Sequence, residues 1–388
     1  MSILHTGFSK IQREYIFPII EKKVLECQKK DLLNLGIGDV SLPLIKPAAE
    51  ALKNAANLMS QNPIGYPSSH GDFALRARIF ELYYKHLGLD IHDIFISDGI
   101  NSDLGDLQEM FSQEALFGTQ DPSYPVPHDV CLMAGRFENT HVIPTFEKDC
   151  FLPYPPSFKL DVVYLCTPNN PTGTAMTKDL LKLWVDWANT HQSVLIIDAA
   201  YCDFIQDDNV PLSIYEIPGA TRCCIELRSF SKSAGFTGLR CSYSIVPKTI
   251  FGGHLQKLWA KRMATKSNGV AFPIQQAALA ALTDVGLEAS KQQVAHYLTM
   301  AKKLKGALDE AGFTTYGAVN APYVFVKCPQ GLSSWQFFDK LLDESSMITV
   351  PGSGFGKQGE GFIRFSGFIT EATCMQALDR IKEQSCLV

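Results

Sequence analysis

The chain lacks several features that mark specialised classes of protein. Only 19% of its 388 residues are charged, and 35 Lys and Arg against 40 Asp and Glu give a formal net charge of −5, without a block of basic residues. This balance argues against a nucleic-acid partner or an anionic membrane surface. No apolar run approaches the roughly 20 residues that cross a bilayer. The first ten residues also lack the charged-then-apolar order of a signal peptide, so we expect no membrane association.

Cysteine and histidine are present without the spacing that would give them a structural role. The 11 cysteines are odd in number and scattered, and none forms a Cys-x-x-Cys pair. This pattern argues against a disulfide framework or a zinc knuckle, and it favours the reducing cytoplasm. The nine histidines include no His-Glu-x-x-His motif and no close pair of ligands, so we predict no metal site.

The chain does have a hydrophobic content of 46%, enough for a large core at this length, and an alternation of apolar strands with helices. Apolar strands separated by helices are typical of a mostly parallel sheet covered on both faces. The predicted fold class is therefore α/β, with helices at 126–136 and 177–190 among those that flank the sheet. The seven strands are expected near residues 94–97, 115–119, 140–146, 161–166, 193–198, 223–228 and 241–246.

Both ends of the chain follow other patterns. The N-terminal stretch 10–34 is expected to be helical, and long helices are expected at 252–266 and 273–311. Short strands and helices then predict a second, smaller α+β domain. Its strands are expected at 322–327, 347–350 and 361–366, and its helices at 334–344 and after Thr370. The expected division is an N-terminal arm that joins the small domain (1–38), a large domain (39–272) and a small C-terminal domain (273–388).

Four loops with polar residues follow predicted strands of the sheet, after Ser97, Cys166, Ile197 and Leu227. Ligands of such sheets bind beyond the carboxyl ends of the strands. The first of these loops runs into a helix that we expect Ser102 or Asp103 to open. Free backbone N–H groups at such a helix start suit an anion. The coincidence of the four loops indicates a ligand site at this edge.

The loop after Leu227 contains a lysine, two serines, two glycines and an arginine between two β-prone runs. A desolvated lysine has a lowered pKa and can attack a carbonyl group. Serine hydroxyls and a nearby arginine suit a phosphate. The loop therefore admits Lys232 bonded to the aldehyde of pyridoxal phosphate, with the phosphate held by Ser229, Ser231 and Arg240. The same residues also fit a polar surface loop with a solvated lysine.

Three other positions admit both a functional and a structural interpretation. Asp198 follows four aliphatic residues, so it needs a cation, such as a pyridinium nitrogen, or it caps the following turn. Asn170, in a turn where Pro171 admits a cis bond, can donate to a ligand oxygen or cap its own backbone. Arg364 lies in an apolar strand, where it binds a carboxylate, joins an internal ion pair or faces water.

In order along the chain, Asn-Pro-Thr-Gly at 170–173, Asp-x-x-Tyr at 198–201, Ser-Phe-Ser-Lys at 229–232, Arg240 and Arg364 resemble the fold-type I aminotransferases that depend on pyridoxal phosphate. The resemblance covers essentially the whole chain. It implies that Lys232 is the catalytic lysine, that Asp198 pairs with the pyridine nitrogen and that Arg364 binds the substrate α-carboxylate. The other implied cofactor contacts are Ile100, Asn101, Tyr124, Asn170, Tyr201, Ser229, Ser231 and Arg240, with Asn101, Tyr124 and Asn170 also facing the substrate.

Within that family, the segments at 13–18, 35–39, 97–99 and 121–126 are most similar to LL-diaminopimelate aminotransferases. This likeness implies transamination between LL-diaminopimelate and 2-oxoglutarate, with Tyr15 and Gly38 lining the substrate pocket. The family forms homodimers with shared sites, so Tyr66 and Asn268 are expected to serve the partner's pocket. Asn101 departs from the family's usual Gly-Ala-Lys, and we expect a looser choice of amino donor. An aspartate, aromatic or alanine type of aminotransferase is the alternative.

Three rival interpretations have weaker support. Ser229-x-x-Lys232 fits a serine acyl enzyme, but the companion Ser-Asp-Asn and Lys-Thr-Gly motifs are absent from the sequence. The glycine-rich stretch 352–357 lacks the spacing of a phosphate-binding P-loop. A regulator that binds pyridoxal phosphate without catalysis would keep Lys232 and Asp198 and would carry a DNA-binding appendage, which the sequence does not reveal.

Overall fold

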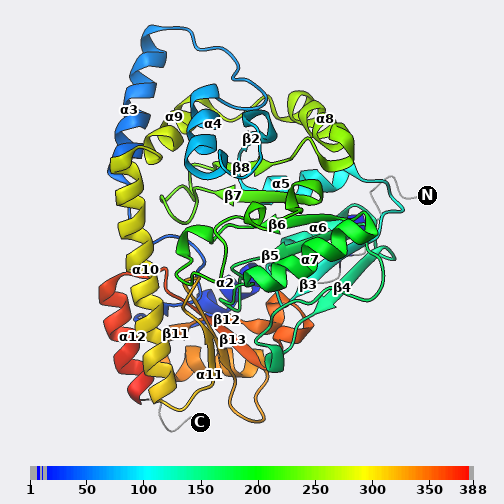
Figure 1. The fold of residues 1–388 in the computed structure, drawn as a ribbon. Coiled ribbons are helices and arrows are strands. Elements are labelled where there is room, and N and C mark those ends of the chain that lie inside the picture. Colours follow the sequence, from blue (N-terminus) through cyan, green and yellow to red (C-terminus); the bar gives the residue numbers. More distant parts are fainter. Residues whose placement is uncertain (1–6, 9–10, 12–14, 384–388) are drawn as a thin grey trace, which may run out of the picture.

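The computed structural model describes residues 7, 8, 11 and 15–383, and its centre is a seven-stranded sheet (Figure 1). The sheet order is β2-β8-β7-β6-β5-β3-β4, in which β8 runs antiparallel to both neighbours and the other paired strands are parallel. The mostly parallel sheet and its seven predicted strands are thus confirmed. The strands are β2 (Ile94–Ser97), β3 (Phe117–Asp121), β4 (Thr140–Pro144), β5 (Val162–Cys166), β6 (Val194–Asp198), β7 (Cys224–Ser229) and β8 (Ser242–Ile245).

The central strands are apolar throughout because both faces of the sheet are buried. Along β5, Val163 and Leu165 pack into one core, whereas Val162 and Tyr164 pack into the core on the opposite face. This alternation is the period of two that a strand imposes on its side chains. One face is covered by α3 (Lys46–Gln61), α4 (Phe73–Ile79), α7 (Lys178–His191) and α9 (Phe272–Ala281). The other face is covered by α5 (Ile100–Leu107), α6 (Val126–Met133) and α8 (His254–Arg262).

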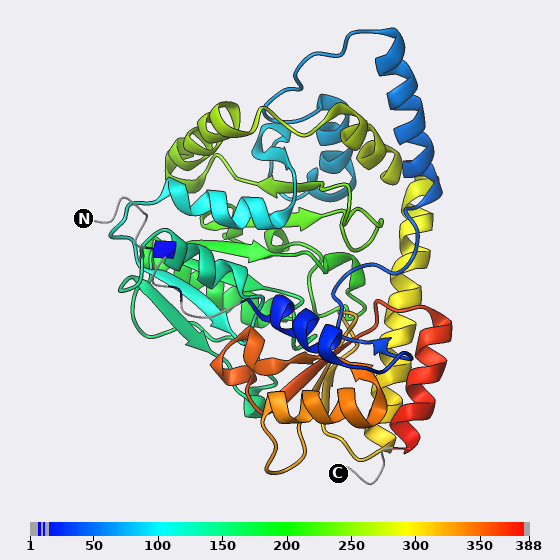
Figure 2. The same cartoon turned by 180° about the vertical axis from the view of Figure 1, so that it is seen from behind.

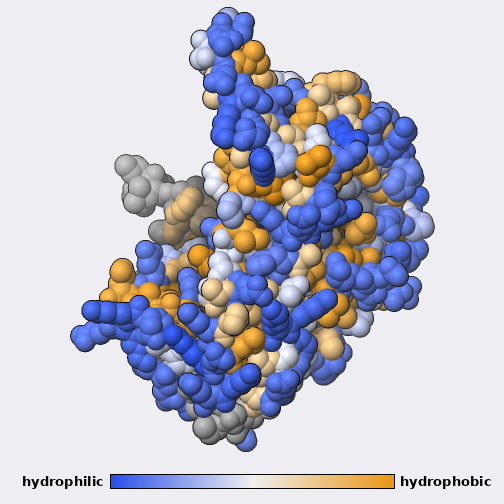
Figure 3. All heavy atoms as spheres, turned by 90° about the vertical axis from the view of Figure 1, so that its left-hand side faces the viewer, coloured by the Kyte–Doolittle hydropathy of each residue, from blue (hydrophilic) through white to orange (hydrophobic). Residues whose placement is uncertain are grey.

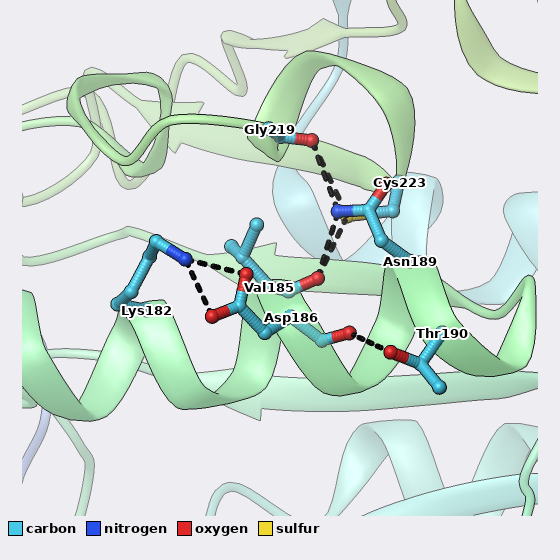
Figure 4. Close-up of polar contacts among 7 residues, drawn as sticks. All are labelled: Lys182, Val185, Asp186, Asn189, Thr190, Gly219 and Cys223. Carbon is cyan, nitrogen blue, oxygen red and sulfur yellow. Dashed lines mark hydrogen bonds and ion pairs between the residues drawn. The ribbon is translucent and has the colours of Figure 1, made fainter.

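Helix α7 is tied to the turn that precedes β7 by the side chain of Asn189 (Figure 4). The Nδ2 atom of Asn189 donates to the carbonyl of Val185 (2.8 Å) in its own helix and to that of Gly219 (3.3 Å) in the turn. It also lies 3.4 Å from the sulfur of Cys223. These contacts fix the end of α7 against the start of β7, which is the strand that leads to Lys232.

A second, four-stranded antiparallel sheet lies below the first, in the order β12-β13-β10-β9 (Figures 1 and 2). Its apolar core also takes in α2 (Ile16–Glu26) and the C-terminal part of α10 (Asp284–Glu310). The strands are β9 (Thr315–Gly317), β10 (Tyr323–Lys327), β12 (Val350–Pro351) and β13 (Phe362–Ser366). The helices packed around it include α11 (Ser334–Ser345) and α12 (Glu371–Glu383). The domain boundaries at residues 38 and 272 stay a prediction.

Two helical predictions were wrong in their extent. The single helix expected at 273–311 is divided between α9 and α10, because the hydroxyl of Thr283 accepts from the backbone N–H of Gly286 and starts a new helix. The helix expected at 10–34 is limited in the described residues to α2, and residues 12–14 lie outside them. Beyond α2, strand β1 (Leu33–Asn34) pairs in parallel with β11 (Met347–Ile348), a tertiary contact that overrides local helical preference.

Membrane-spanning character is absent from the described ranges 7–8, 11 and 15–383, since none of their helices combines enough length with enough apolarity to cross a bilayer.

Candidate active site

A cavity of about 370 Å³ lies beyond the carboxyl ends of β5, β6 and β7, where the central sheet meets the second sheet. This is the edge of the sheet at which the sequence predicts a ligand. Of the fifteen predicted site residues, twelve line the cavity. They are Gly38, Ile100, Asn101, Tyr124, Asn170, Asp198, Tyr201, Ser229, Ser231, Lys232, Arg240 and Arg364.

Lys232 lies three residues beyond the end of β7, with its side chain half-buried in the cavity. Its Nζ donates to the carbonyl oxygen of Gly38 and lies 5.6 Å from the ring centroid of Phe368. Burial lowers the pKa of Lys232 to about 8, because desolvation disfavours the charged ammonium. The lowered pKa increases the share of Lys232 that is the free amine near neutral pH, which is the form that attacks a carbonyl.

Asp198 is the last residue of β6, and only 7% of it is exposed. Its Oδ1 accepts from the backbone N–H of Ala200 (3.0 Å), so the carboxylate does cap its own turn, as the structural interpretation expects. Burial raises the pKa of Asp198 to about 6. Among the described residues it has no Lys, Arg or His at ion-pair distance. A buried carboxyl facing a cavity without a cationic partner fits the protonated ring nitrogen of pyridoxal phosphate.

Arg364, on β13, is completely buried and lies across the cavity from β6. Its Nη1 donates to Oδ1 of Asn170 (2.6 Å) and its Nη2 to the carbonyl oxygen of Gly36, while its Nε has no partner among the described residues. The guanidinium stacks between Tyr323 and Phe355, 4.5 Å and 4.9 Å from their ring centroids. Burial lowers the pKa of Arg364. No carboxylate of the described residues pairs with it, so the internal ion pair weighed from the sequence is excluded there.

Asn170 and Tyr201 lie beside this arginine. The Asn170–Pro171 bond is cis, as the sequence admits, and two further X–Pro bonds of the region, after Asp121 and Thr167, are also cis. The hydroxyl of Tyr201 lies 2.7 Å from that of Tyr323. Asn170 and Tyr201, both expected to contact the cofactor's ring hydroxyl, thus border the cavity on the side of Arg364 and Tyr323.

The expected phosphate side is formed where α5 begins next to the loop that precedes β8. Helix α5 starts at Ile100, with Gly99 as its N-cap, so the expectation that Ser102 or Asp103 opens it was wrong. Gly99 has φ of +130°, and a Cβ there would lie 2.1 Å from Nη2 of Arg240. The early start puts the backbone N–H groups of Ile100 and Asn101 in the first turn, where a helix leaves them without intrahelical partners.

Ser229 and Ser231 complete that side of the cavity. The Ser229 hydroxyl accepts from the backbone N–H of Ser231 (3.0 Å) and donates weakly to the carbonyl of Cys241 (3.4 Å). Hydroxyls, helix N–H groups and an exposed guanidinium converge here, and together they form a donor set suited to a phosphate.

Asn101, Tyr124 and Tyr15 form a polar row at the cavity mouth. Nδ2 of Asn101 donates to the hydroxyl of Tyr124 (3.1 Å), which lies 3.4 Å from the hydroxyl of Tyr15. Tyr15 therefore approaches the site through Tyr124 and does not itself line the cavity. Gly38 does line it, and a Cβ there would lie 3.0 Å from the Tyr323 hydroxyl. Of the N-terminal segment used for the family resemblance, Arg13 and Glu14 lie outside the described residues.

Tyr66 and Asn268 are the two predicted site residues that the structure places away from the cavity. Tyr66 is 90% exposed, and Asn268 is exposed with a positive φ of 54°. Their loops meet, since a Cβ at Gly269 would lie 2.8 Å from the carbonyl oxygen of Ser68. The structure therefore brings these two segments together on one surface, away from the pocket of their own chain.

Sequence reasoning missed seven residues that line the cavity. They are Phe17, Ile37, Asp39, Cys166, Ala200, Thr237 and Tyr323. Tyr323 is the most informative, because its ring packs under Arg364 and its hydroxyl meets that of Tyr201. In the sequence, the local sign of its role is a polar aromatic residue at the start of an apolar strand. Its position beside Arg364 depends on the pairing of β10 with β13, which is a tertiary contact.

The fold and this donor set define an aminotransferase of fold type I. A model of the aminotransferase class I and II family matches residues 30–381, and the chain belongs to this family. It is similar to the LL-diaminopimelate aminotransferase of Agathobacter rectalis, with 43% identity over 98% of this chain and 99% of the relative. The enzyme of the same name from Methanosphaera stadtmanae is 40% identical over 97% of each chain.

Solved structures agree with these relatives. The L,L-diaminopimelate aminotransferase from Chlamydomonas reinhardtii superposes with a TM-score of 0.94 and 35% identity, covering 99% of this chain and 98% of that one. An aspartate aminotransferase mutant from Thermus thermophilus has a TM-score of 0.87 at 20% identity, a likeness that shows the shared fold alone.

Proposed function

We propose that this chain is a pyridoxal-phosphate-dependent transaminase that moves an amino group between LL-diaminopimelate and 2-oxoglutarate. The observation that carries the activity is the convergence in one cavity of a lysine of lowered pKa, a buried carboxyl and a buried guanidinium, the last two without an ion pair among the described residues. The choice of amino donor rests on the full-length similarity to the two enzymes of that name.

We assign residues of the cavity to each part of the cofactor. Lys232 would bond to its aldehyde carbon, Asp198 would face its ring nitrogen, and Tyr124 would cover its ring. The donors at the start of α5, together with Ser229, Ser231 and Arg240, would hold the phosphate. When bound, pyridoxal phosphate supplies an electron sink for the carbanion that forms at the amino acid's α-carbon.

The chain's own groups supply binding and proton transfer. Arg364 holds the substrate α-carboxylate with a fork that Asn170 and the carbonyl of Gly36 already orient. The free amine of Lys232 would act as the base that takes the proton from the substrate's α-carbon, and its ammonium form would give that proton back as the acid. Tyr323 and Phe355 keep water from the guanidinium, which strengthens its attraction for a carboxylate. The second substrate, an oxo acid, uses the same sites in reverse order.

Asn101 supports a looser choice of donor than the family's usual lysine would allow. Its amide is engaged with the hydroxyl of Tyr124 at the cavity mouth, and it brings no positive charge to the ligands. Turnover with LL- and meso-diaminopimelate, lysine and glutamate tests this point. Reaction of the LL form alone would refute the looser choice and leave the transaminase proposal intact.

A homodimer with shared sites is proposed from the exposed surface that carries Tyr66. The end of α3 and the loop after it project from the body of the chain (Figures 1 and 3). This region exposes the large apolar side chains of Leu58, Met59, Tyr66 and Phe73. A surface of this kind is typical of a protein interface. Sedimentation of the purified protein tests the assembly.

A cytoplasmic location is proposed from the ten described cysteines, all of which are free.

The decisive experiment is the visible spectrum of the purified protein and of its Lys232→Ala variant, before and after addition of LL-diaminopimelate. The native protein should absorb in the visible range with pyridoxal phosphate, and the amino acid should change that absorbance. The variant should show neither the native band nor turnover. Native protein that stays colourless when supplied with pyridoxal phosphate would refute the proposed function.

A further inference from the structure

Asp103, in the first turn of α5, is a buried acid that the proposed chemistry does not use. Only 1% of it is exposed, and burial raises the pKa of its carboxyl to about 8. Its Oδ2 accepts from the hydroxyls of Ser97 (2.6 Å) and Ser242 (3.3 Å), whereas its Oδ1 has no partner among the described residues. Burial of a carboxyl group costs free energy, and its hydrogen bonds to the two serines offset part of that cost.

The two hydroxyls connect Asp103 to the backbone of Gly99. Ser97 Oγ and Ser242 Oγ lie 2.7 Å apart, and the N–H of Gly99 donates to Ser242 Oγ (3.0 Å). Each hydroxyl has one proton to donate. Because Ser97 gives its proton to Asp103, Ser242 has to give its own to Ser97 or directly to the carboxyl. In both cases a lone pair of Ser242 remains for the N–H of Gly99. The acceptor at position 103 thus sets the direction of the whole network.

Gly99 is the point at which the two parts of the expected phosphate site meet. It is the N-cap of α5, and its carbonyl accepts from the N–H groups of Ser102 (3.0 Å) and Asp103 (3.3 Å). Its α-carbon lies against the guanidinium of Arg240, which approaches closer than any side chain at position 99 would allow. Ser242, which receives the N–H of Gly99, is two residues beyond Arg240 in the chain. The network therefore sets the distance between the helix start and the arginine.

We propose that Asp103 is a positioning residue that, through Ser97 and Ser242, holds Gly99 and the start of α5 against Arg240 so that both grip one phosphate. The inference rests on the proposed function, since the phosphate is that of pyridoxal phosphate. The acceptor oxygen of Asp103 is what orders the hydrogen bonds. A negative charge on Asp103 is not needed, and it would repel the phosphate. Replacement by Asn, which keeps an acceptor of the same shape, should therefore be tolerated, and replacement by Leu should not.

The test compares two aldehydes that differ in the phosphate alone. Dissociation constants of pyridoxal phosphate and of pyridoxal are measured by absorbance on enzyme freed of cofactor, for the native chain, Asp103→Leu and Asp103→Asn. Asp103→Leu should weaken pyridoxal phosphate by roughly tenfold, the effect expected for a lost set of buried hydrogen bonds. Its affinity for pyridoxal should be unchanged, and Asp103→Asn should resemble the native chain with both ligands.

Ser242→Ala removes the hydroxyl that accepts from the N–H of Gly99, without emptying a large volume, and it should show the same selective loss. Ser244→Ala is the matched control, because Ser244 is a buried serine of the same strand that accepts from Trp259 Nε1 (3.1 Å) and does not reach Gly99. Equal losses for both aldehydes, or unchanged preference for the phosphate in Asp103→Leu and Ser242→Ala, would overturn the proposal. Native protein that binds neither aldehyde would overturn the proposed function as well, so the two failures are distinguishable.

Discussion

Replacement of Arg364 by lysine is expected to weaken the reaction of α-amino acids while leaving cofactor binding intact. Lysine keeps a positive charge in the same strand but offers one point of contact in place of a planar fork. It also loses the bond from Nη1 to Oδ1 of Asn170 (2.6 Å) that orients the native group. The substitution therefore keeps the positive charge but loses the planar, two-point contact with a carboxylate.

The magnitude follows from the contacts that remain. A hydrogen bond between charged groups contributes about 1.5–3 kcal/mol, so a carboxylate held by two such bonds gains ~3–6 kcal/mol from Arg364. Arg364→Lys keeps about half of this gain, and we expect kcat/KM to fall by roughly 10- to 100-fold. Arg364→Leu removes the whole gain, and the loss should reach ~10²- to 10⁴-fold.

The assay compares LL-diaminopimelate with an amine of similar length that has no α-carboxylate. The native chain should prefer the amino acid strongly, and the variants should lose that preference, with the absorbance of bound cofactor unchanged. Arg380→Lys is the matched control, because Arg380 binds the backbone of residues 345 and 346 and an exposed aspartate, and it does not line the cavity. An Arg364→Lys variant that keeps native kcat/KM for the amino acid would refute the assignment.

Four further predictions concern three other residues of the cavity. Lys232 has a pKa of about 8 in the folded chain against an ordinary 10.5, so cofactor-free protein should gain stability as pH rises from about 8 to 10.5, and Lys232→Met should abolish this rise in urea unfolding. Asp198→Asn should lower kcat by roughly 10²-fold or more, since a neutral amide does not pair with a cationic ring nitrogen. Because its folded pKa is raised to about 6, Asp198 stabilises the cofactor-free fold below pH 3.8, and this stability is lost as pH rises through 6; the Asn variant should lack that dependence. Gly38→Ala should raise KM for amino acids by roughly tenfold in steady-state assays, because its Cβ would crowd the Tyr323 hydroxyl beside Arg364, and an unchanged KM would contradict the crowding.

Local patterns in the sequence were sufficient for the central sheet and for the residues at its strand ends. All seven strands appear where apolar runs place them, because strands buried on both faces need uninterrupted aliphatic residues. Asp198 ends such a strand, and Lys232 and Asn170 lie three and four residues beyond the ends of two others. Parallel strands end at one edge of the sheet, so these residues were expected to meet, and they line one cavity.

Helix boundaries depended on contacts that local patterns do not contain. Serine and aspartate at 102 and 103 are good capping residues, yet Gly99 is the N-cap, because its positive φ and the hydroxyl of Ser242 fix the chain three residues before Ser102. The buried Asp103 is engaged by Ser97 and Ser242, which come from two different strands of the sheet. Hydrogen bonds to two strands that are far apart in the sequence but adjacent in the sheet outweigh the local preference for capping.

By itself, the sequence determined the α/β class, the strands of the main sheet, and a lysine, an acid and an amide at the edge where ligands bind. The tertiary structure alone decided what surrounds Arg364: Asn170, Gly36 and Tyr323 reach it from elements far apart in the chain. It also separated Tyr66 and Asn268 from their own cavity and brought their loops together. The physical reason is that periodicity and turn chemistry act over a few residues, whereas the partner of a buried charge is chosen by how the two sheets pack.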